Sequence, residues 1–146
     1  CPKFEKNKTF FNVEKCYCIH RYERNRETGY CEPCAVGYYK GYIGDFRCNK
    51  CPENTTTRRT GSFHKMECRC EIGFEKKGNQ TSCKTCEIGY YKNSIELLDC
   101  LQCPQNTTTT ERGTTSLSDC VCKPGYFRNA EENCILCEPN SINSDE

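Results

Sequence analysis

The sequence predicts a small disulfide-rich fold, in which tandem modules are built from short two-stranded β-hairpins and loops. Three observations lead to this prediction. Cysteine occurs 17 times in 146 residues, which is typical of a disulfide scaffold. The cysteines repeat at fixed spacing. Leu, Ile, Val and Phe together number only 22, which is too few for a large hydrophobic core.

The cysteine spacing is the same in two consecutive units. From Cys31 to Cys70 the pattern is C-x2-C-x13-C-x2-C-x16-C-x-C, and it restarts at Cys83 with the same gaps. The next start, Cys134, arrives one residue earlier. Such a repeat indicates a tandem array of covalently stapled modules. A module of about fifty residues loses roughly 75 kcal/mol of conformational entropy on folding, so its few apolar residues would leave it only marginally stable. Three disulfides that contribute roughly 3 kcal/mol each are enough to make such a module stably folded.

The segments between the cysteines are short and are interrupted by Gly, Pro, Asn and Thr, so they predict hairpin strands and irregular loops. Strand-forming residues are concentrated in residues 37–42, 55–59 and 89–92. Helix should be minimal, at most a turn near Ser94 to Leu98.

One stretch, running from Cys34 to Cys83, resembles a known family. It combines C-x2-G-Y-Y, then C-x2-C-P-x-N-T-T-T, then C-x-C-x2-G-F and a closing cysteine. This form is similar to the cysteine-rich EGF-like module of Eph-type receptor ectodomains and of tandem-repeat extracellular proteins. The resemblance implies an elongated rod of EGF-like modules. The expected modules are a partial one at 1–33, full ones at 34–85 and 86–136, and the start of a further one at 137–146.

The first unit departs from the family pattern, because Cys18-Ile19-His20-Arg21-Tyr22 lacks the glycine of the hairpin. An altered hairpin is therefore expected there. Cys1-Pro2 also matches Cys51-Pro52, so residue 1 lies in the middle of a repeat, and we expect the chain to be part of a longer array.

The resemblance also implies the EGF order of disulfide pairing, first with third, second with fourth and fifth with sixth. Carried onto this chain, it gives Cys18 with Cys31, Cys34 with Cys51, Cys48 with Cys68, Cys70 with Cys83, Cys86 with Cys103, Cys100 with Cys120, and Cys122 with Cys134. Cys1 and Cys16 would then pair with cysteines upstream and Cys137 with one downstream. The alternative is TNF-receptor-like pairing, in which Cys51 closes on Cys68. Spacing by itself leaves fifteen arrangements of six cysteines open.

The cysteines and the glycosylation signals agree on the compartment. Disulfides persist in an oxidising environment, so the protein should be secreted or lie on the outer face of a membrane. Four N-x-T sequons predict N-linked glycans at Asn7, Asn54, Asn79 and Asn106. Asn54 and Asn106 occupy the same phase of the repeat and should share one face.

The cysteines and histidines also allow other interpretations. Cys31, Cys34, Cys48 and Cys51 also have the spacing of a zinc ribbon, although the extra C-x-C pairs would be left unused. A redox C-x2-C requires a βαβ context that is absent, and the positions preceding the first cysteine of each module lack the acidic cluster of calcium-binding EGF modules. His20 and His64 stand alone in charged loops. No nucleophile and base can be combined, so neither an enzyme nor a cofactor is expected.

Two tyrosine pairs, Tyr38-Tyr39 and Tyr90-Tyr91, recur once per module. In each pair one ring is expected to cover a disulfide while the other lies at a module junction. The alternative is an exposed aromatic stripe that binds a partner chain or a sugar. Similarly, the Asn-Thr-Thr-Thr tracts form either an extended edge or a glycan-bearing ridge.

Net charge and linker length restrict the partners. The net charge is +1 with 21 basic and 20 acidic residues interspersed, which argues against nucleic acid or an anionic membrane as the main partner. Only two residues separate the closing cysteine of one module from the first of the next, so neighbouring modules should touch and form a stiff rod.

These features predict a non-enzymatic extracellular spacer, stalk or filament component that contacts neighbouring modules and associates with a protein or with itself. The alternative is the membrane-proximal EGF-like region of an adhesion protein or receptor.

Overall fold

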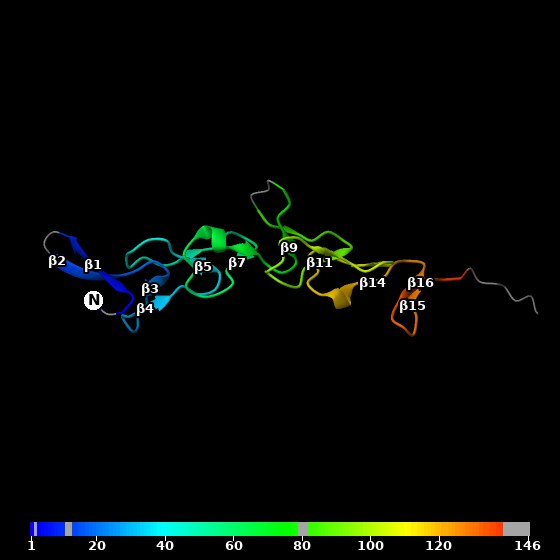
Figure 1. Cartoon of the computed structure of the whole chain (residues 1–146), viewed down its shortest axis with the longest axis horizontal. Coiled ribbons are helices and arrows are strands. Elements are labelled where there is room, and N and C mark those ends of the chain that lie inside the picture. The colour runs from blue at the N-terminus through cyan, green and yellow to red at the C-terminus, as the bar shows by residue number, and fades with distance from the viewer. Residues whose placement is uncertain (2, 11–12, 79–81, 139–146) are drawn as a thin grey trace, which may run out of the picture. The chain divides into compact units, whose positions relative to one another are not determined.

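The computed structural model describes residues 1, 3–10, 13–78 and 82–138, and divides the chain into two compact units (Figure 1). Unit 1 contains residues 1–71 and 78–83. Unit 2 contains residues 72–77 and 84–146. No helix in the described part of the chain is long and apolar enough to cross a membrane.

Every sheet within the described residues is a two-stranded antiparallel ladder, as the sequence predicts. The ladders of unit 1 are β1 (Glu5–Phe10) with β2 (Val13–Cys18), β3 (Tyr22–Arg24) with β4 (Cys31–Pro33), β5 (Tyr38–Tyr39) with β6 (Asn49–Lys50), and β7 (Thr55–Thr56) with β8 (Arg69–Cys70). Those of unit 2 are β9 (Phe74–Glu75) with β10 (Lys84–Thr85), β11 (Tyr90–Tyr91) with β12 (Leu101–Gln102), β13 (Thr107–Thr108) with β14 (Val121–Cys122), and β15 (Tyr126–Arg128) with β16 (Cys134–Leu136).

Three of the ladders begin within the predicted strand segments: β5 lies in 37–42, β7 in 55–59 and β11 in 89–92. The segment near Ser94 forms a turn in which the Ser94 hydroxyl accepts a hydrogen bond from the Glu96 amide at 3.1 Å. Two 3-10 helices, η1 (Lys65–Glu67) and η2 (Leu117–Asp119), were not predicted. Each has only three residues, too few for a periodic apolar pattern to appear in the sequence.

Eight disulfides connect the ladders, and each joins a cysteine to the next one along the chain. They are Cys1–Cys16, Cys18–Cys31, Cys34–Cys48, Cys51–Cys68, Cys70–Cys83, Cys86–Cys100, Cys103–Cys120 and Cys122–Cys134. Their Cα–Cα distances of 5.5–5.8 Å lie in the range that a disulfide spans without backbone distortion.

The EGF order of pairing is therefore wrong for four predicted bridges: Cys34 with Cys51, Cys48 with Cys68, Cys86 with Cys103, and Cys100 with Cys120. The structure has the alternative, in which Cys51 closes on Cys68. The physical reason is that every ladder folds one short segment back on itself, so the ends of that segment meet. The pairs predicted for Cys18, Cys70 and Cys122 already followed this local order and are found in the structure.

The first bridge is a second correction, because Cys1 and Cys16 pair with each other rather than with upstream cysteines. Cys16 has the same place in its repeat as Cys68, and Cys1 the same place as Cys51. Among the described cysteines, Cys137 is the one without a partner in this chain.

The hairpin that lacks glycine is formed without alteration, contrary to expectation. Arg21 has φ +75°, the same value as Gly73 at the equivalent position of unit 2. Tyr22 pairs with Pro33 as Phe74 pairs with Thr85. The hydrogen bonds of the following module hold Arg21 in the left-handed region, which an ordinary residue seldom adopts.

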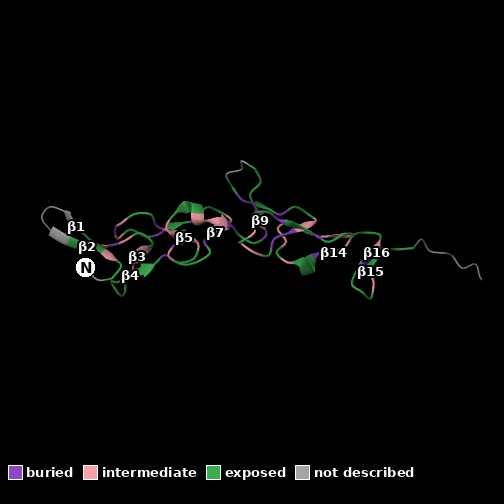
Figure 2. Cartoon of the chain, viewed as in Figure 1, coloured by how far each residue is buried: buried purple, intermediate pink, exposed green. Residues whose placement is uncertain are grey.

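Most of the buried residues are half-cystines, and most other described residues are exposed or half-buried (Figure 2). In unit 2 Tyr91 packs with Cys103 and Cys120. Four of the buried polar side chains recur in the repeat: Lys40 matches Lys92, and Thr57 matches Thr109. Both units are therefore stabilised by disulfides and by a few buried polar groups rather than by an apolar core.

Candidate interaction surface and hairpin–module junctions

A buried lysine joins each hairpin to the module that follows it. Lys40 and Lys92 have no exposed surface, although lysine is almost never fully buried without a partner. The Lys92 ammonium donates a hydrogen bond to the carbonyl oxygen of Phe74 in β9 at 2.7 Å. The Lys40 ammonium donates to the carbonyl of Tyr22 in β3 at 2.6 Å and also to that of Gly44. A cation thus ties the hairpin backbone to the next module in both units.

A glutamate of the hairpin supplies the second polar connection. In unit 2, Oε2 of Glu75 accepts a hydrogen bond from the Cys100 amide at 2.9 Å, and in unit 1 Oε2 of Glu23 accepts from the Cys48 amide at 2.9 Å. The exposed fraction of Glu75 is only 5%. Each glutamate therefore binds the backbone beside a cysteine of the next module.

Backbone hydrogen bonds complete the junction. In unit 2 the Cys86 amide donates to the carbonyl of Gly73 at 2.8 Å, and the Gly73 amide donates to that of Lys92 at 2.9 Å. In unit 1 Arg21 makes the same two bonds with Cys34 and Lys40, both at 2.8 Å. These bonds cross the boundaries expected after residues 33 and 85. The predicted boundaries themselves stay a prediction.

The electrostatics of the two lysines are similar. Burial lowers the pKa of Lys92, and the carboxylates of Glu75 and Asp99 partly offset this effect. Burial also lowers the pKa of Lys40, and Asp45 and Glu23 act in the opposite direction. The glutamates therefore favour the charged form of a lysine that burial disfavours.

These junction residues were missed by the sequence analysis, although their signal was present. Lys40 and Lys92 end the repeated C-x2-G-Y-Y-K strings, and Glu23 and Glu75 follow the aromatic residue of each hairpin. A lysine that recurs in phase with the cysteines has a structural role here, which polarity alone does not suggest.

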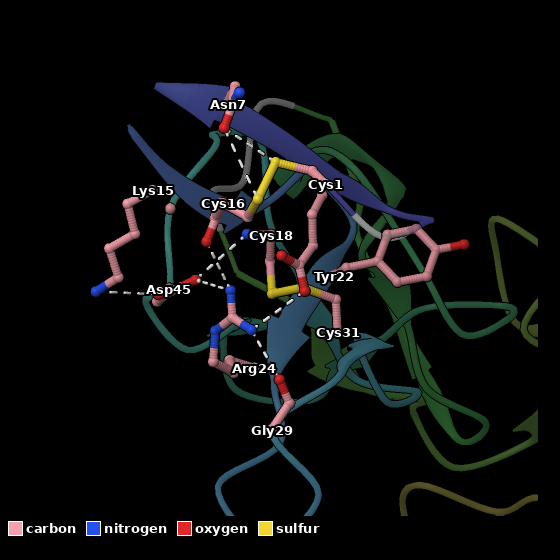
Figure 3. Close-up of polar contacts among 12 residues, drawn as sticks. Cys1, Asn7, Lys15, Cys16, Cys18, Tyr22, Arg24, Gly29, Cys31 and Asp45 are labelled. Carbon is pink, nitrogen blue, oxygen red and sulfur yellow. Dashed lines mark hydrogen bonds and ion pairs between the residues drawn. A yellow bond between two sulfur atoms is a disulfide. The ribbon is translucent and has the colours of Figure 1, made fainter. Parts of the chain in front are cut away.

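An arginine connects three segments at the start of the chain (Figure 3). Nη1 of Arg24 donates to the carbonyl of Gly29 at 2.7 Å and lies 3.2 Å from Oε1 of Glu5. Nη2 donates to the carbonyl of Cys16 at 2.8 Å and lies 3.0 Å from Oδ1 of Asp45. Burial would lower the pKa of Arg24, but the two carboxylates outweigh it and raise the pKa above its usual value.

The two tyrosine pairs are only partly equivalent. Tyr91 is buried against the Cys103–Cys120 disulfide, whereas the Lys77 ammonium lies 5.5 Å from the ring centroid of Tyr90. In unit 1 Tyr38 is 38% exposed and Tyr39 is half-buried. One ring of the second pair therefore covers a disulfide, as expected. A partner for the tyrosines stays a prediction.

The sequon residues Asn54 and Asn106 have left-handed backbones, with φ of +57° and +60°. Each lies in a turn closed by the following threonine, whose amide donates to a proline carbonyl at 3.1 Å. Asparagine tolerates this conformation better than most residues. The turn can therefore explain why asparagine recurs at this position, independently of glycosylation. Nδ2 of Asn106, the atom to which an N-linked glycan would be attached, donates a hydrogen bond to the carbonyl of Cys134 at 3.0 Å.

Glycosylation of Asn54 and Asn106 stays a prediction. Asn7 is exposed in β1, with Oδ1 3.1 Å from Sγ of Cys1. The sequon at Asn79 lies outside the described residues.

The histidines differ in their surroundings. The rings of His20 and Phe63 pack edge to face, with their centroids 5.2 Å apart. Nδ1 of His64 accepts a hydrogen bond from the Met66 amide at 3.1 Å, and Glu67 accepts from the amides of Phe63 and His64. This capping box begins η1. Glu67 has a lowered pKa, because the two amide bonds outweigh the opposing effect of burial.

The zinc alternative conflicts with the disulfides. Cys31, Cys34, Cys48 and Cys51 are all oxidised and cannot offer thiolates. In the described part of the chain, no group of three His, Cys, Asp or Glu side chains is arranged to hold a metal ion.

Comparison with known proteins agrees with this architecture. The profile of the family described as "Tyrosine-protein kinase ephrin type A/B receptor-like" matches residues 22–68 and 73–120. The chain belongs to this family. Both matches begin at the hairpin and end at the first cysteine of the C-x-C pair, Cys68 or Cys120, so each ephrin receptor-like match includes a hairpin–module junction.

Three curated proteins are similar to this chain. "Cysteine repeat modular protein A" of Toxoplasma gondii is 29% identical over 89% of this chain and 5% of its own length. "Sushi, von Willebrand factor type A, EGF and pentraxin domain-containing protein 1" of Rattus norvegicus is 36% identical over 72% of this chain and 3% of its own. "Ephrin type-B receptor 2" of Coturnix japonica is 41% identical over 42% of this chain and 6% of its own.

The chain thus spans a small fraction of these relatives. It is an extracellular cysteine-rich repeat segment of a kind that is generally non-enzymatic.

Proposed function

We propose that this chain is a structural spacer: a part of an extracellular repeat array in which ephrin receptor-like modules set length and stiffness. The observation that carries the proposal is the polar junction described above. Four hydrogen bonds from the hairpin of unit 2 to the next module involve Gly73, Phe74 and Glu75. The hairpin of unit 1 makes the same set.

A spacer requires that neighbouring elements keep a fixed geometry. A flexible linker does not provide this, because the distance between its ends fluctuates and only its r.m.s. value is set by the number of residues. The two-residue linker Lys84-Thr85 is itself paired in a strand with β9. A change in the angle between the hairpin and the module would also break the hydrogen bond from Lys92 to the Phe74 carbonyl and the one from the Cys100 amide to Glu75. These features support a fixed rather than a hinged connection.

The test measures the distance distribution between spin labels placed at exposed Lys76 and Ser118 of unit 2 through unnatural amino acids, by double electron–electron resonance. The control is a variant with Gly-Gly-Ser inserted between Thr85 and Cys86, which separates the hairpin from its module. We expect a narrow distribution in the natural chain and a broad one in the insertion variant. Equally broad distributions in the two proteins would contradict a spacer role.

A second candidate is the membrane-proximal region of an adhesion protein or receptor, favoured by the similarity to Ephrin type-B receptor 2. The complete open reading frame distinguishes the two. Many similar repeats would favour the spacer, whereas a few repeats beside other domains and a transmembrane helix would favour the receptor.

A further inference from the structure

The charge of equivalent segments is inverted between the two units. Residues 34–69 of unit 1 contain seven Lys or Arg and three Asp or Glu. The equivalent residues 86–121 of unit 2 have the same length and the same two disulfides, yet contain two basic and five acidic residues. The near-zero net charge of the whole chain conceals this contrast.

The inversion occurs at specific positions of the repeat. Going from unit 1 to unit 2, the six positions are Arg47 and Asp99, Lys50 and Gln102, Arg58 and Thr110, Arg59 and Glu111, Lys65 and Leu117, and Arg69 and Val121. The first five basic residues are exposed and Arg69 is half-buried. Within the described residues, Arg47, Lys50, Arg59, Lys65 and Arg69 form no salt bridge with a carboxylate.

These cations are not required by the fold. Unit 2 forms the same ladders and disulfides with acidic or uncharged residues at the six positions. The lysine that the fold does require is present in both units, as Lys40 and Lys92. Arg47, Lys50, Arg59, Lys65 and Arg69 are thus additional to the structural set and available to a partner.

We propose that the basic segment 47–69 of unit 1, mainly through Arg47, Lys50 and Arg59, binds a sulfated polysaccharide of the extracellular space. Sulfate groups suit arginine, whose planar guanidinium offers paired donors to oxyanions. A polyanion can contact several cations at once and releases its condensed counterions on binding. The binding segment would then give a repeat array a fixed point of attachment to the extracellular matrix.

A second copy of the chain is the competing partner, because the acidic segment of its unit 2 complements the basic one. Such a contact would consist of separate exposed ion pairs, which contribute little and are screened at physiological ionic strength. Counterion release from a polyanion is the larger effect, so the polysaccharide is the favoured partner.

The experiment uses the full chain, secreted with its disulfides, and measures binding to immobilised heparin and to heparan sulfate fragments by surface plasmon resonance. The test variant carries Arg47→Asp, Lys50→Gln, Arg58→Thr and Arg59→Glu, which are the residues that unit 2 has at these positions. The control variant carries Arg26→Glu, Lys76→Gln, Lys84→Gln and Lys123→Glu, which alters four other exposed cations and lowers the net charge equally.

We expect the test variant to lose at least tenfold in affinity and the control to lose less than threefold. Binding of the natural chain should weaken on the order of 100-fold between 50 and 200 mM salt, for about four contacts. The reverse exchange, Asp99→Arg, Gln102→Lys, Thr110→Arg and Glu111→Arg, should create a second site and tighten binding.

Equal losses in the test and control variants would overturn the proposal, because binding would then follow net charge alone. Two other results would also overturn it. The first is binding of the natural chain to phosphatidylserine vesicles but not to the polysaccharide. The second is salt-sensitive self-association in sedimentation velocity that the test variant abolishes, without polysaccharide binding.

Discussion

Unit 1 and unit 2 share the disulfides and the junction contacts of the repeat but differ in the charge of the surface around them. Both have the local disulfides, a buried lysine bonded to the preceding hairpin, and a hairpin glutamate bonded to a cysteine amide. Around this shared set the charge changes sign. The comparison teaches that disulfides and a few buried polar contacts are sufficient for this fold, so the surface can diverge between neighbouring repeats.

The largest effect is expected from removing one bridge of the shared set. Replacing Cys86 and Cys100 of unit 2 by Ser opens a bridge of sequence separation 14 and should cost about 3 kcal/mol of unfolding free energy. Cys86 also bonds the backbone of Gly73 and Gly113, so the junction of unit 2 should open first. Hydrogen exchange with mass spectrometry locates the opening.

The matched control replaces Cys34 and Cys48, which have the same separation in unit 1. It should open unit 1 and leave unit 2 protected. Loss of protection in both units from either change would show that the comparison of independent units is wrong.

The next effect concerns Gly73 and Arg21, which have the same φ of +75°. A Cβ on Gly73 would lie 2.3 Å from the carbonyl oxygen of Gly113, a contact that requires the backbone to move. Gly73→Ala should therefore cost about 2–3 kcal/mol from the left-handed conformation and overpacking together. Chemical denaturation with intact disulfides measures it.

Arg21→Ala is the control for this position, because unit 1 already accommodates a side chain there. It should change the unfolding free energy by less than about 1 kcal/mol. A harmless Gly73→Ala variant would show that Gly113 can move away.

A smaller effect is expected at the buried glutamate. Glu75→Ala removes the acceptor of the Cys100 amide and a carboxylate near Lys92, at a cost of about 2 kcal/mol. Glu23→Ala in unit 1 should cost less, since Lys40 also donates to Gly44 and lies near Asp45. Denaturation curves of the two variants test this order. Glu75→Gln, which keeps an acceptor, should recover part of the loss, and equal costs for both alanine variants would contradict the account.

The smallest effect distinguishes the two 3-10 helices by pH. The lowered pKa of Glu67 means that its capping bonds stabilise η1 above the unfolded pKa of about 4.3 and are lost as the pH falls through the folded value. Below that pH the amides of Phe63 and His64 should shift in NMR spectra, with a loss under about 1 kcal/mol. Glu67→Gln should remove this titration.

The cap of η2 provides the internal comparison. The Ser116 hydroxyl accepts from the Ser118 amide at 3.2 Å, and a hydroxyl does not titrate in this range. The Ser118 amide should therefore not follow the Glu67 titration. An equal shift at Ser118 would indicate general acid unfolding instead.

The sequence by itself determined the repeat, the disulfide-rich class, the hairpin strands and the extracellular family, because fixed cysteine spacing and turn residues act locally. It also placed a tyrosine over a disulfide, since an aromatic ring beside cysteines is the available apolar cover.

The tertiary structure decided the pairing of Cys34 with Cys48 and of Cys51 with Cys68, because connectivity depends on which ends the ladders bring together. It also decided the role of Lys40 and Lys92. In the sequence these are two charges among many, and only the burial of their ammonium groups against the carbonyl groups of Tyr22 and Phe74 shows that they hold the junctions. The left-handed backbone of Arg21 was likewise decided by the tertiary structure, because hydrogen bonds with Cys34 and Lys40 impose a conformation that arginine disfavours.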